Sequence, residues 1–399
     1  MQYRTDKKKG REFSALGYGC LRFTKEGGQI DLKKAEEEIR LAIEAGVNYF
    51  DTGYTYAGSE EALGTILLRN GWREKVYVAT KLPGYLVTRE GGFERFFTEQ
   101  LKRLKTSYVD VYLMHMLTDK KAWEKLEALG VRQWLDQKKE NGQIKSVGFS
   151  FHGDTKTFLE LLEVYDWDLC QIQYNYLDEH TQAGRAGLLA AYEKGIPVVI
   201  MEPLRGGRLV HALPPKARKA IEEKNISPAE LGLRWLYDQK EVTTVLSGMN
   251  EKEMVLQNVR VADSALPGCF TEEERALVEE VKKNIWESLF VPCTGCAYCM
   301  PCPHGVDIPA AFWGYNGIGV DGKKRARFEY VRNVGLRRGN AFPTACVGCG
   351  ACERHCPQFI PIREKLKEAK KALLPWPYRA AASVAKRFVL RREDAKNGG

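Results

Sequence analysis

Apolar runs rich in β-branched residues alternate with longer amphipathic segments along roughly the first two thirds of the chain. Each run has the length of a buried strand, and the segments between the runs have the apolar spacing of a helix. Strand–helix alternation repeated eight times predicts an α/β fold, a (β/α)8 TIM barrel, rather than an open doubly wound sheet, because no Gly-x-Gly-x-x-Gly motif follows the first run. The predicted strands are residues 15–20, 47–51, 76–81, 109–115, 144–150, 169–174, 197–201 and 242–246. Helices are predicted at 32–45, 60–69, 92–105, 122–140, 155–165, 181–194, 228–239 and 271–283.

Polar residues stand at the carboxyl ends of the predicted strands, where the catalytic groups of barrel enzymes gather. Asp51, Lys81 and His115 each close a strand. Tyr56 follows Asp51 in the next loop, with Tyr54 as its nearest rival. A phenol with a pKa near 10 donates a proton poorly at neutral pH, but a nearby ammonium group lowers that pKa. We interpret the set as a proton-donor site in which Asp51 holds Lys81, Lys81 acts on Tyr56, and His115 orients a carbonyl group.

The stretches around these positions resemble the aldo-keto reductase family. In chain order they are FDTGYTYAGSEEALG, ATK, LMH, IKSVGFS, CQIQYN, PLRGG and VLSGMNEKEMVLQNV, and the resemblance covers about residues 1–285. It implies an oxidoreductase acting on a small carbonyl or alcohol, with Asp51, Tyr56, Lys81 and His115 as the catalytic tetrad. It also implies a site for NADPH or NADH. The residues implied there are Ser150 and Gln171 at the carboxamide, Met201 at the stacking position, Leu204, Gly206 and Gly207 at the pyrophosphate, and Asn258 at the adenine.

The chain departs from the family pattern inside that cofactor site. Phe151 replaces an Asn, and Met201 replaces a Tyr and is followed by Glu202. Gly248 and Met254 stand where the family has basic residues for the 2′-phosphate. A phosphate without Arg or Lys partners loses charge-assisted hydrogen bonds. We therefore expect no strong preference for NADPH over NADH.

Eight of the eleven cysteines form two short runs, each ending in Cys-Pro. Such clustering indicates metal ligation rather than a disulfide framework, and the second run matches the bacterial [4Fe–4S] pattern. Zinc sites also use Cys-x-x-Cys pairs, but two triplets with Cys-Pro favour iron–sulfur. Because the fourth Cys of each run ligates the other cluster in two-cluster ferredoxins, two clusters are predicted. The predicted sets are Cys293, Cys296, Cys299 and Cys356 for the first cluster, and Cys346, Cys349, Cys352 and Cys302 for the second.

These motifs predict three regions: a barrel at 1–285, a mainly helical ferredoxin-like domain at 286–374 and a basic tail at 375–399. Residues 286–399 hold 19 Lys and Arg against 9 Asp and Glu. The excess charge favours an acidic partner, such as a ferredoxin or flavodoxin, although a solvated basic face is the alternative. No nucleic-acid motif accompanies the charge. The basic residues concerned are Lys323, Lys324, Arg325, Arg327, Arg337 and Arg338, followed by Lys386, Arg387, Arg391 and Arg392.

Neither a long apolar span nor an apolar leader is visible, so we expect no transmembrane span and a cytoplasmic location. Hydride transfer with clusters for electron transfer is the first hypothesis for the function. The alternative is an electron-transfer protein whose barrel binds a nicotinamide or a flavin. A hydride carries two electrons and a cluster accepts one, so coupling the two usually needs a flavin, and a barrel mouth can hold one without a sequence fingerprint. A third hypothesis gives the clusters a purely structural role.

Overall fold

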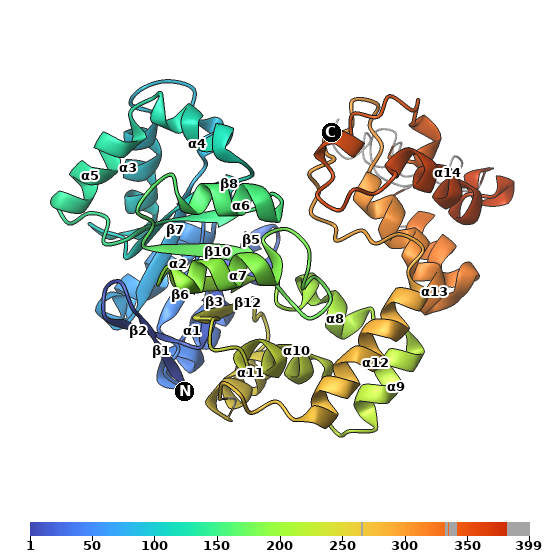
Figure 1. Cartoon of the computed structure of the whole chain (residues 1–399), viewed down its shortest axis with the longest axis horizontal. Coiled ribbons are helices and arrows are strands. Elements are labelled where there is room, and N and C mark those ends of the chain that lie inside the picture. The colour runs from blue at the N-terminus through green and yellow to red at the C-terminus, as the bar shows by residue number, and fades with distance from the viewer. Residues whose placement is uncertain (265, 332–333, 335–340, 381–399) are drawn as a thin grey trace. The chain divides into compact units, whose positions relative to one another are not determined.

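The eight predicted strands form a closed barrel of parallel strands (Figure 1). The computed structural model describes residues 1–264, 266–331, 334 and 341–380. Around the barrel the order is β10, β11, β12, β3, β6, β7, β8 and β9, so pairing of β12 with β3 closes the sheet. The predicted (β/α)8 fold is confirmed. The strands are β3 (Leu16–Gly19), β6 (Tyr49–Asp51), β7 (Tyr77–Leu82), β8 (Val111–Leu117), β9 (Val147–Phe151), β10 (Leu169–Gln173), β11 (Val198–Met201) and β12 (Thr244–Ser247).

Amphipathic helices cover the outside of the barrel, and Asp residues cap several of them. Asp31, for example, accepts a hydrogen bond from Lys34 N at the start of α1. The predicted helix 122–140 is wrong as a single element, because Gly130 adopts φ +83° between α4 and α5. The helices are α1 (Leu32–Glu44), α2 (Ser59–Arg69), α3 (Gly92–Leu104), α4 (Lys120–Glu127), α5 (Val131–Glu140), α6 (Thr155–Leu162), α7 (Gly184–Glu193), α10 (Pro228–Tyr237) and α11 (Lys252–Ser264).

An N-terminal hairpin, which the sequence pattern did not predict, closes one end of the barrel. Its strands are β1 (Tyr3–Asp6) and β2 (Arg11–Ser14). The Phe13 ring lies 5.1 Å from the Tyr49 ring and 5.0 Å from the Tyr77 ring, both at the start of barrel strands. The open mouth is therefore at the other end, where the strands finish. A second small hairpin, β4 (Lys25–Glu26) and β5 (Gln29–Ile30), follows β3 in the chain.

The chain divides into two compact units. The barrel unit comprises Met1–Gly206 and Ile226–Arg275, and the cluster unit comprises Gly207–Asn225 and the chain from Ala276. The sequence-based division at residue 285 keeps 207–225 with the barrel, whereas the structure groups this segment, with α8 (Arg208–His211) and α9 (Pro215–Glu222), with the cluster unit. One continuous helix, α12 (Glu272–Ser288), contains the point at which the chain passes between the units.

The cluster unit is mainly helical, with α13 (Ile308–Tyr330) and α14 (Ile362–Leu373) around an apolar core that includes Phe312 and Leu366. Buried Asn316 on α13 accepts hydrogen bonds from the N–H groups of Phe290 and Val291. These bonds position the chain just before the first cysteine run.

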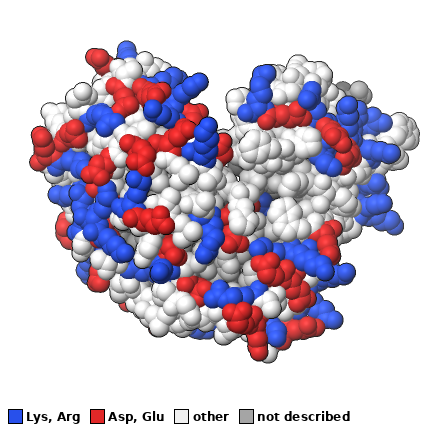
Figure 2. Space-filling model, viewed as in Figure 1, with Lys and Arg blue, Asp and Glu red and all other residues white. Residues whose placement is uncertain are grey.

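Charged side chains are exposed on both units. On the face in Figure 2, basic and acidic side chains are interspersed over the barrel unit. Lys323, Lys324 and Arg325 are exposed on α13. Arg337, Arg338 and the basic residues 386–392 lie outside the described residues. Within the described part of the chain, no helix has the length and apolarity needed to cross a membrane.

Candidate active site and iron–sulfur centre

The carboxyl ends of neighbouring strands bring the four predicted catalytic residues together. Asp51 ends β6, Lys81 lies near the end of β7, and His115 lies near the end of β8. Tyr56 reaches the same place from the loop after β6. Parallel strands in a barrel end at one rim, so residues far apart in sequence become neighbours there.

Lys81 is the buried centre of this group. Its ammonium nitrogen lies 2.6 Å from Asp51 Oδ1 and donates a second bond, also of 2.6 Å, to the carbonyl oxygen of Thr52. The sequence analysis did not foresee this second acceptor, because any residue supplies a carbonyl oxygen. Burial by itself lowers the pKa of Lys81, but the nearby oxygens of Asp51 and Tyr56 outweigh it and raise that pKa overall. Lys81 therefore stays a cation.

Tyr56, rather than Tyr54, faces the ammonium group. Lys81 Nζ lies 4.8 Å from the centre of the Tyr56 ring, and the Tyr56 and His115 rings lie 6.1 Å apart. The Tyr54 ring instead packs edge-on against Phe96 at 4.8 Å. Burial raises the pKa of Tyr56, and the Lys81 charge offsets only part of that rise. Lys81 thus lowers the pKa of Tyr56 as expected, but burial outweighs this effect and keeps the phenol protonated in the free site.

His115 is neutral in this environment. Burial lowers the pKa of His115 to about 3, with smaller contributions from Lys81 and His152. Burial likewise lowers the pKa of His152 to about 4. His152 follows β9 and was not singled out from the sequence, where only its place at a strand end could have indicated it. A neutral imidazole can donate one N–H to a substrate oxygen without carrying charge.

Ser150 and Gln171 lie on neighbouring strands at the same rim, paired through β9 and β10. The Gln171 side chain lies beside Asp51, and its carbonyl oxygen is buried with no hydrogen-bond partner among the described residues. Ser150 Oγ accepts a bond from Met116 N and keeps its own proton to donate. An unpaired buried acceptor beside a hydroxyl donor suits a carboxamide ligand, which offers both an N–H and a C=O.

The other predicted cofactor residues are spread along β11, the following turn and α11. Met201 is half-buried at the end of β11, and Leu204 lies in the turn after it. Gly206 and Gly207 have φ values of +64° and +86°, a conformation that favours glycine. Asn258 is buried, and its side-chain amide donates to Ser247 Oγ at the end of β12.

Arg22 is a neighbour of this turn that the sequence analysis missed. A Cβ on Gly206 would lie 2.8 Å from Arg22 Nη2, and one on Gly248 would lie 2.9 Å from Arg22 Cδ. The two glycines thus make room for the arginine. Met254, by contrast, packs against the barrel core. A basic side chain therefore lies beside Gly248, although the family's basic residue at that position is missing.

The eight clustered cysteines surround two cavities in the cluster unit. One is lined by Cys293, Cys296, Cys299 and Cys356, and the other by Cys302, Cys346, Cys349 and Cys352. Each cavity thus takes three cysteines from one run and the fourth from the other. Among the described residues, no group of three or more His, Cys, Asp or Glu side chains is arranged to hold a single metal ion. Thiolates held apart around a cavity suit a cluster better than a zinc ion, which draws four sulfurs to about 2.3 Å.

Left-handed residues shape both cysteine loops. Gly295 and Ala297 in the first run, and Gly348 and Gly350 in the second, all have φ between +65° and +77°. A backbone that turns at every second residue can point successive N–H groups inward; the Gly295 N–H, for example, bonds to the Cys293 sulfur. Ile308 lines both cavities, so the two lie side by side at the start of α13.

Comparison with known proteins identifies the family of the barrel and the kind of domain that follows it. A family profile described as "Aldo/keto reductase family" matches residues 15–281. The chain belongs to the aldo/keto reductase family. A second profile, described as "4Fe-4S dicluster domain", matches residues 292–360 of this aldo/keto reductase. It is therefore an oxidoreductase in which an iron–sulfur domain follows the barrel.

Several named relatives share the barrel with this aldo/keto reductase. An aldo-keto reductase of Mycolicibacterium vanbaalenii is 28% identical over 60% of this chain and 81% of its own length. L-glyceraldehyde 3-phosphate reductase of Escherichia coli K12 is 23% identical over 72% of this chain and 95% of its own. Among solved structures, the holo form of aldo-keto reductase AKR11C1 from Bacillus halodurans is 25% identical, with a TM-score of 0.58 over 70% of this chain and 96% of its own. An aldo/keto reductase of Klebsiella pneumoniae, solved with NADP and acetate, is 23% identical and has the same TM-score over 71% and 96%.

The buried histidines of this aldo/keto reductase generate a prediction about pH. Because their pKa values lie near 3 and 4, far below the ordinary value, neither imidazole should gain a proton between pH 8 and pH 5.5. NMR of the ring protons should show two of the six histidines with constant shifts across that range. His115→Asn and His152→Asn identify the two signals. A ring at either position that titrates near pH 6.5 would contradict the burial argument.

Proposed function

We propose that this aldo/keto reductase transfers a hydride between NAD(P)H and a small carbonyl or alcohol, with Tyr56 as the proton donor. The observation that carries the proposal is the buried Lys81–Asp51 pair beside Tyr56 and His115 at one barrel mouth. The two electrons of this reaction pass directly from the nucleotide to the carbonyl, so two [4Fe–4S] clusters in the cluster unit would exchange single electrons in a separate step. Coupling that step to the nucleotide would need a bound flavin, which accepts one electron or two.

The side chains divide the proton chemistry between them. When bound, the nicotinamide supplies the hydride. Neutral His115 donates a hydrogen bond to the carbonyl oxygen and orients it. Tyr56 gives its proton to that oxygen as negative charge develops there, and the Lys81 cation stabilises the phenolate left behind. In the reverse direction the phenolate takes the proton of the alcohol.

The chain's own residues fit a nicotinamide nucleotide. The unpaired Gln171 oxygen and the Ser150 hydroxyl would hold the carboxamide. Arg22 lies at the Gly206 turn, where the pyrophosphate is expected, and also at Gly248. Its guanidinium would supply a charge-assisted contact that both NADH and NADPH can use.

The two cysteine sets fit two iron–sulfur clusters. Each cavity is bordered by four thiol groups, the number that a [4Fe–4S] cluster needs. When bound, the clusters accept or release single electrons. Cys349 is the exposed member of the eight, which brings the second set closest to solvent.

A second candidate is an electron-transfer protein that exchanges electrons with an acidic carrier, such as a ferredoxin or flavodoxin. The exposed Lys323, Lys324 and Arg325 on α13 favour it. Addition of NADPH or NADH to the anaerobic protein separates the candidates by EPR. Clusters reduced by nucleotide, together with extracted flavin and no carbonyl turnover, would favour electron transfer as the main function.

Replacing Tyr56 by Phe should lower carbonyl reduction at least about 100-fold, the size of a lost general acid. The ring remains, so nucleotide binding should change little. Tyr54→Phe is the matched control, because that ring packs on Phe96 away from Lys81. Steady-state kinetics with each nucleotide provide the measurement. If only the Tyr54 variant lost activity, the assignment of Tyr56 as the proton donor would be refuted.

Anaerobically purified protein should contain about eight iron atoms and eight acid-labile sulfides, as two [4Fe–4S] clusters require. Cys356→Ala should remove the fourth ligand of the set formed by Cys293, Cys296 and Cys299, and lower iron toward about four per chain. Cys269→Ala, in the barrel unit, should leave the content unchanged. Zinc without labile sulfide would refute the assignment.

Arg22→Gln should weaken both nucleotides about tenfold, as expected for one charge-assisted hydrogen bond. If the contact is with the pyrophosphate, the affinity ratio of NADPH to NADH stays nearly constant and remains below about tenfold. Lys25→Gln, an exposed basic residue on β4, is the control. Fluorescence titration of each nucleotide measures the effect. If the variant bound NADH and NADPH with unchanged affinity, Arg22 would not contact the nucleotide.

A further inference from the structure

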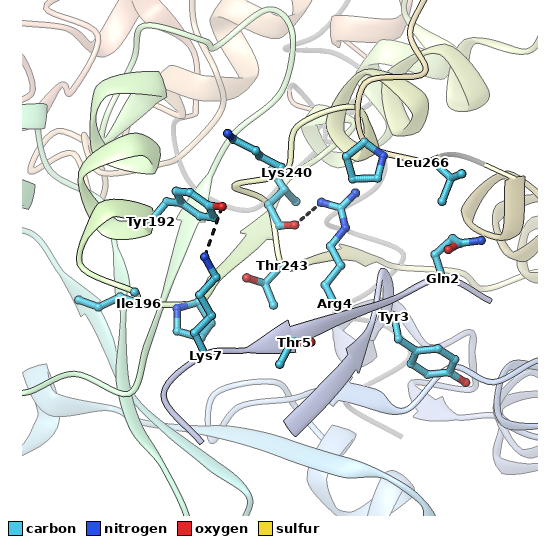
Figure 3. A pocket seen from close by; sticks show the side chains of 14 residues that line it. Gln2, Tyr3, Arg4, Thr5, Lys7, Tyr192, Ile196, Lys240, Thr243 and Leu266 are labelled. Carbon is cyan, nitrogen blue, oxygen red and sulfur yellow. Dashed lines mark hydrogen bonds between the residues drawn. The ribbon is translucent and has the colours of Figure 1, made fainter. Parts of the chain in front are cut away.

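A pocket of about 350 Å³ opens on the barrel unit at the end opposite the four predicted catalytic residues (Figure 3). Its walls come from β1 and from the segments Gly195–Pro197 and Val242–Thr243, which immediately precede β11 and β12. The tetrad lies where strands end, and this pocket lies where strands begin. It is therefore separate from the proposed catalytic site, and its ligand does not depend on the proposed function.

Two lysines converge in this pocket without an acidic partner. Lys7 Nζ lies 3.4 Å from the Tyr192 hydroxyl and 4.5 Å from the centre of that ring. Lys240 Nζ lies 6.0 Å from the same centre, and Figure 3 shows the two lysines on either side of Tyr192. Neither forms a salt bridge within the part of the chain that the structure describes, and no Asp or Glu lines the pocket. Because the two ammonium groups repel each other, an anion that binds between them is favoured.

Arg4 is a third cation of the pocket, but its donors are already used. Its guanidinium bonds to the carbonyl oxygens of Tyr237, Gln239 and Val242, where α10 ends. Glu241 and Asp238 also act on its charge. Arg4 therefore fixes the wall and compensates the carboxyl end of a helix, which leaves Lys7 and Lys240 for a ligand.

The rest of the wall determines the class of ligand. Ile196, Pro197 and Leu266 add apolar surface to the wall; Ile196 lies on the side of Tyr192 and Leu266 on the opposite side (Figure 3). Thr5 and Thr243 add hydroxyl groups. A carboxylate carries one charge, whereas a phosphate monoester carries about −1.5 to −2 at pH 7 and three acceptor oxygens. Two ammonium groups with hydroxyls beside them match the phosphate better.

We propose that this pocket binds a phosphate monoester with a small apolar or aromatic group. Lys7 and Lys240 hold the phosphate, and the apolar group packs against Tyr192 and the apolar residues of the wall. The volume lies at the small end of the range for ligand sites, about 300 to 1,000 Å³. The occupant is therefore a small molecule rather than a dinucleotide.

Phenyl phosphate is the probe, and calorimetric titration of the full-length, cluster-loaded protein measures its binding. The double variant Lys7→Gln/Lys240→Gln should bind it at least about tenfold more weakly, the effect of losing a charge-assisted hydrogen bond. The double variant Lys8→Gln/Lys9→Gln also removes two positive charges, from positions next to Lys7 in the chain, but these lysines pair with Asp166 and Asp168. Binding to this control should be unchanged.

Two further ligands separate the contribution of the phosphate charge from that of the apolar group. Inorganic phosphate should bind more weakly than phenyl phosphate because it buries no apolar surface, and benzyl alcohol should not bind because it lacks the charge. Iron content and the thermal unfolding midpoint check that each variant is folded. No binding of phenyl phosphate at millimolar concentration would overturn the proposal. The proposal would also be overturned if the Lys7/Lys240 variant bound phenyl phosphate as tightly as the unmodified protein, because the ligand would then lie elsewhere. It would be overturned too if inorganic phosphate bound as tightly as phenyl phosphate, because the apolar wall would then contribute nothing.

Discussion

The ion pair of Lys81 with Asp51 is the constraint on which the barrel mouth depends. An ammonium group buried without a partner is strongly disfavoured, and breaking such a pair by removing one member typically costs about 3–5 kcal/mol. Lys81 meets this requirement with one carboxylate and one carbonyl oxygen, both at 2.6 Å. Because the two partners belong to adjacent strands, the pair also links the ends of β6 and β7 at the barrel mouth.

Burial sets the protonation states of the groups around that pair. It keeps the His115 imidazole neutral and the Tyr56 phenol protonated, so the site consists of the Lys81–Asp51 ion pair and two neutral donors. The Lys81 charge is too weak to reverse the effect of burial on the tyrosine in the free protein. In the reaction proposed above, proton donation from Tyr56 would therefore depend on the negative charge that a substrate oxygen develops.

In the cluster unit, local backbone geometry places the cysteine sulfur atoms. Left-handed residues at alternate positions curl each cysteine loop, and the core of α13 and α14 holds the two loops against each other. Each loop alone brings three sulfur atoms to a cavity. The fourth comes from the other loop, so neither set of four is complete until the whole unit has folded.

The sequence by itself determined the barrel, the meeting of Asp51, Tyr56, Lys81 and His115 at its mouth and the two cysteine runs, because strand–helix periodicity and short motifs are local signals. Even the exchange of Cys302 and Cys356 between the runs followed from a motif with known spacing. Only the tertiary structure decided what lies beside Gly248, since Arg22 comes from the loop after β3, more than 200 residues away in the chain. The direction of the Tyr56 pKa and the pocket between Lys7 and Lys240 likewise depend on burial and on contacts between distant segments. No local pattern encodes those quantities, because they arise only when the barrel closes.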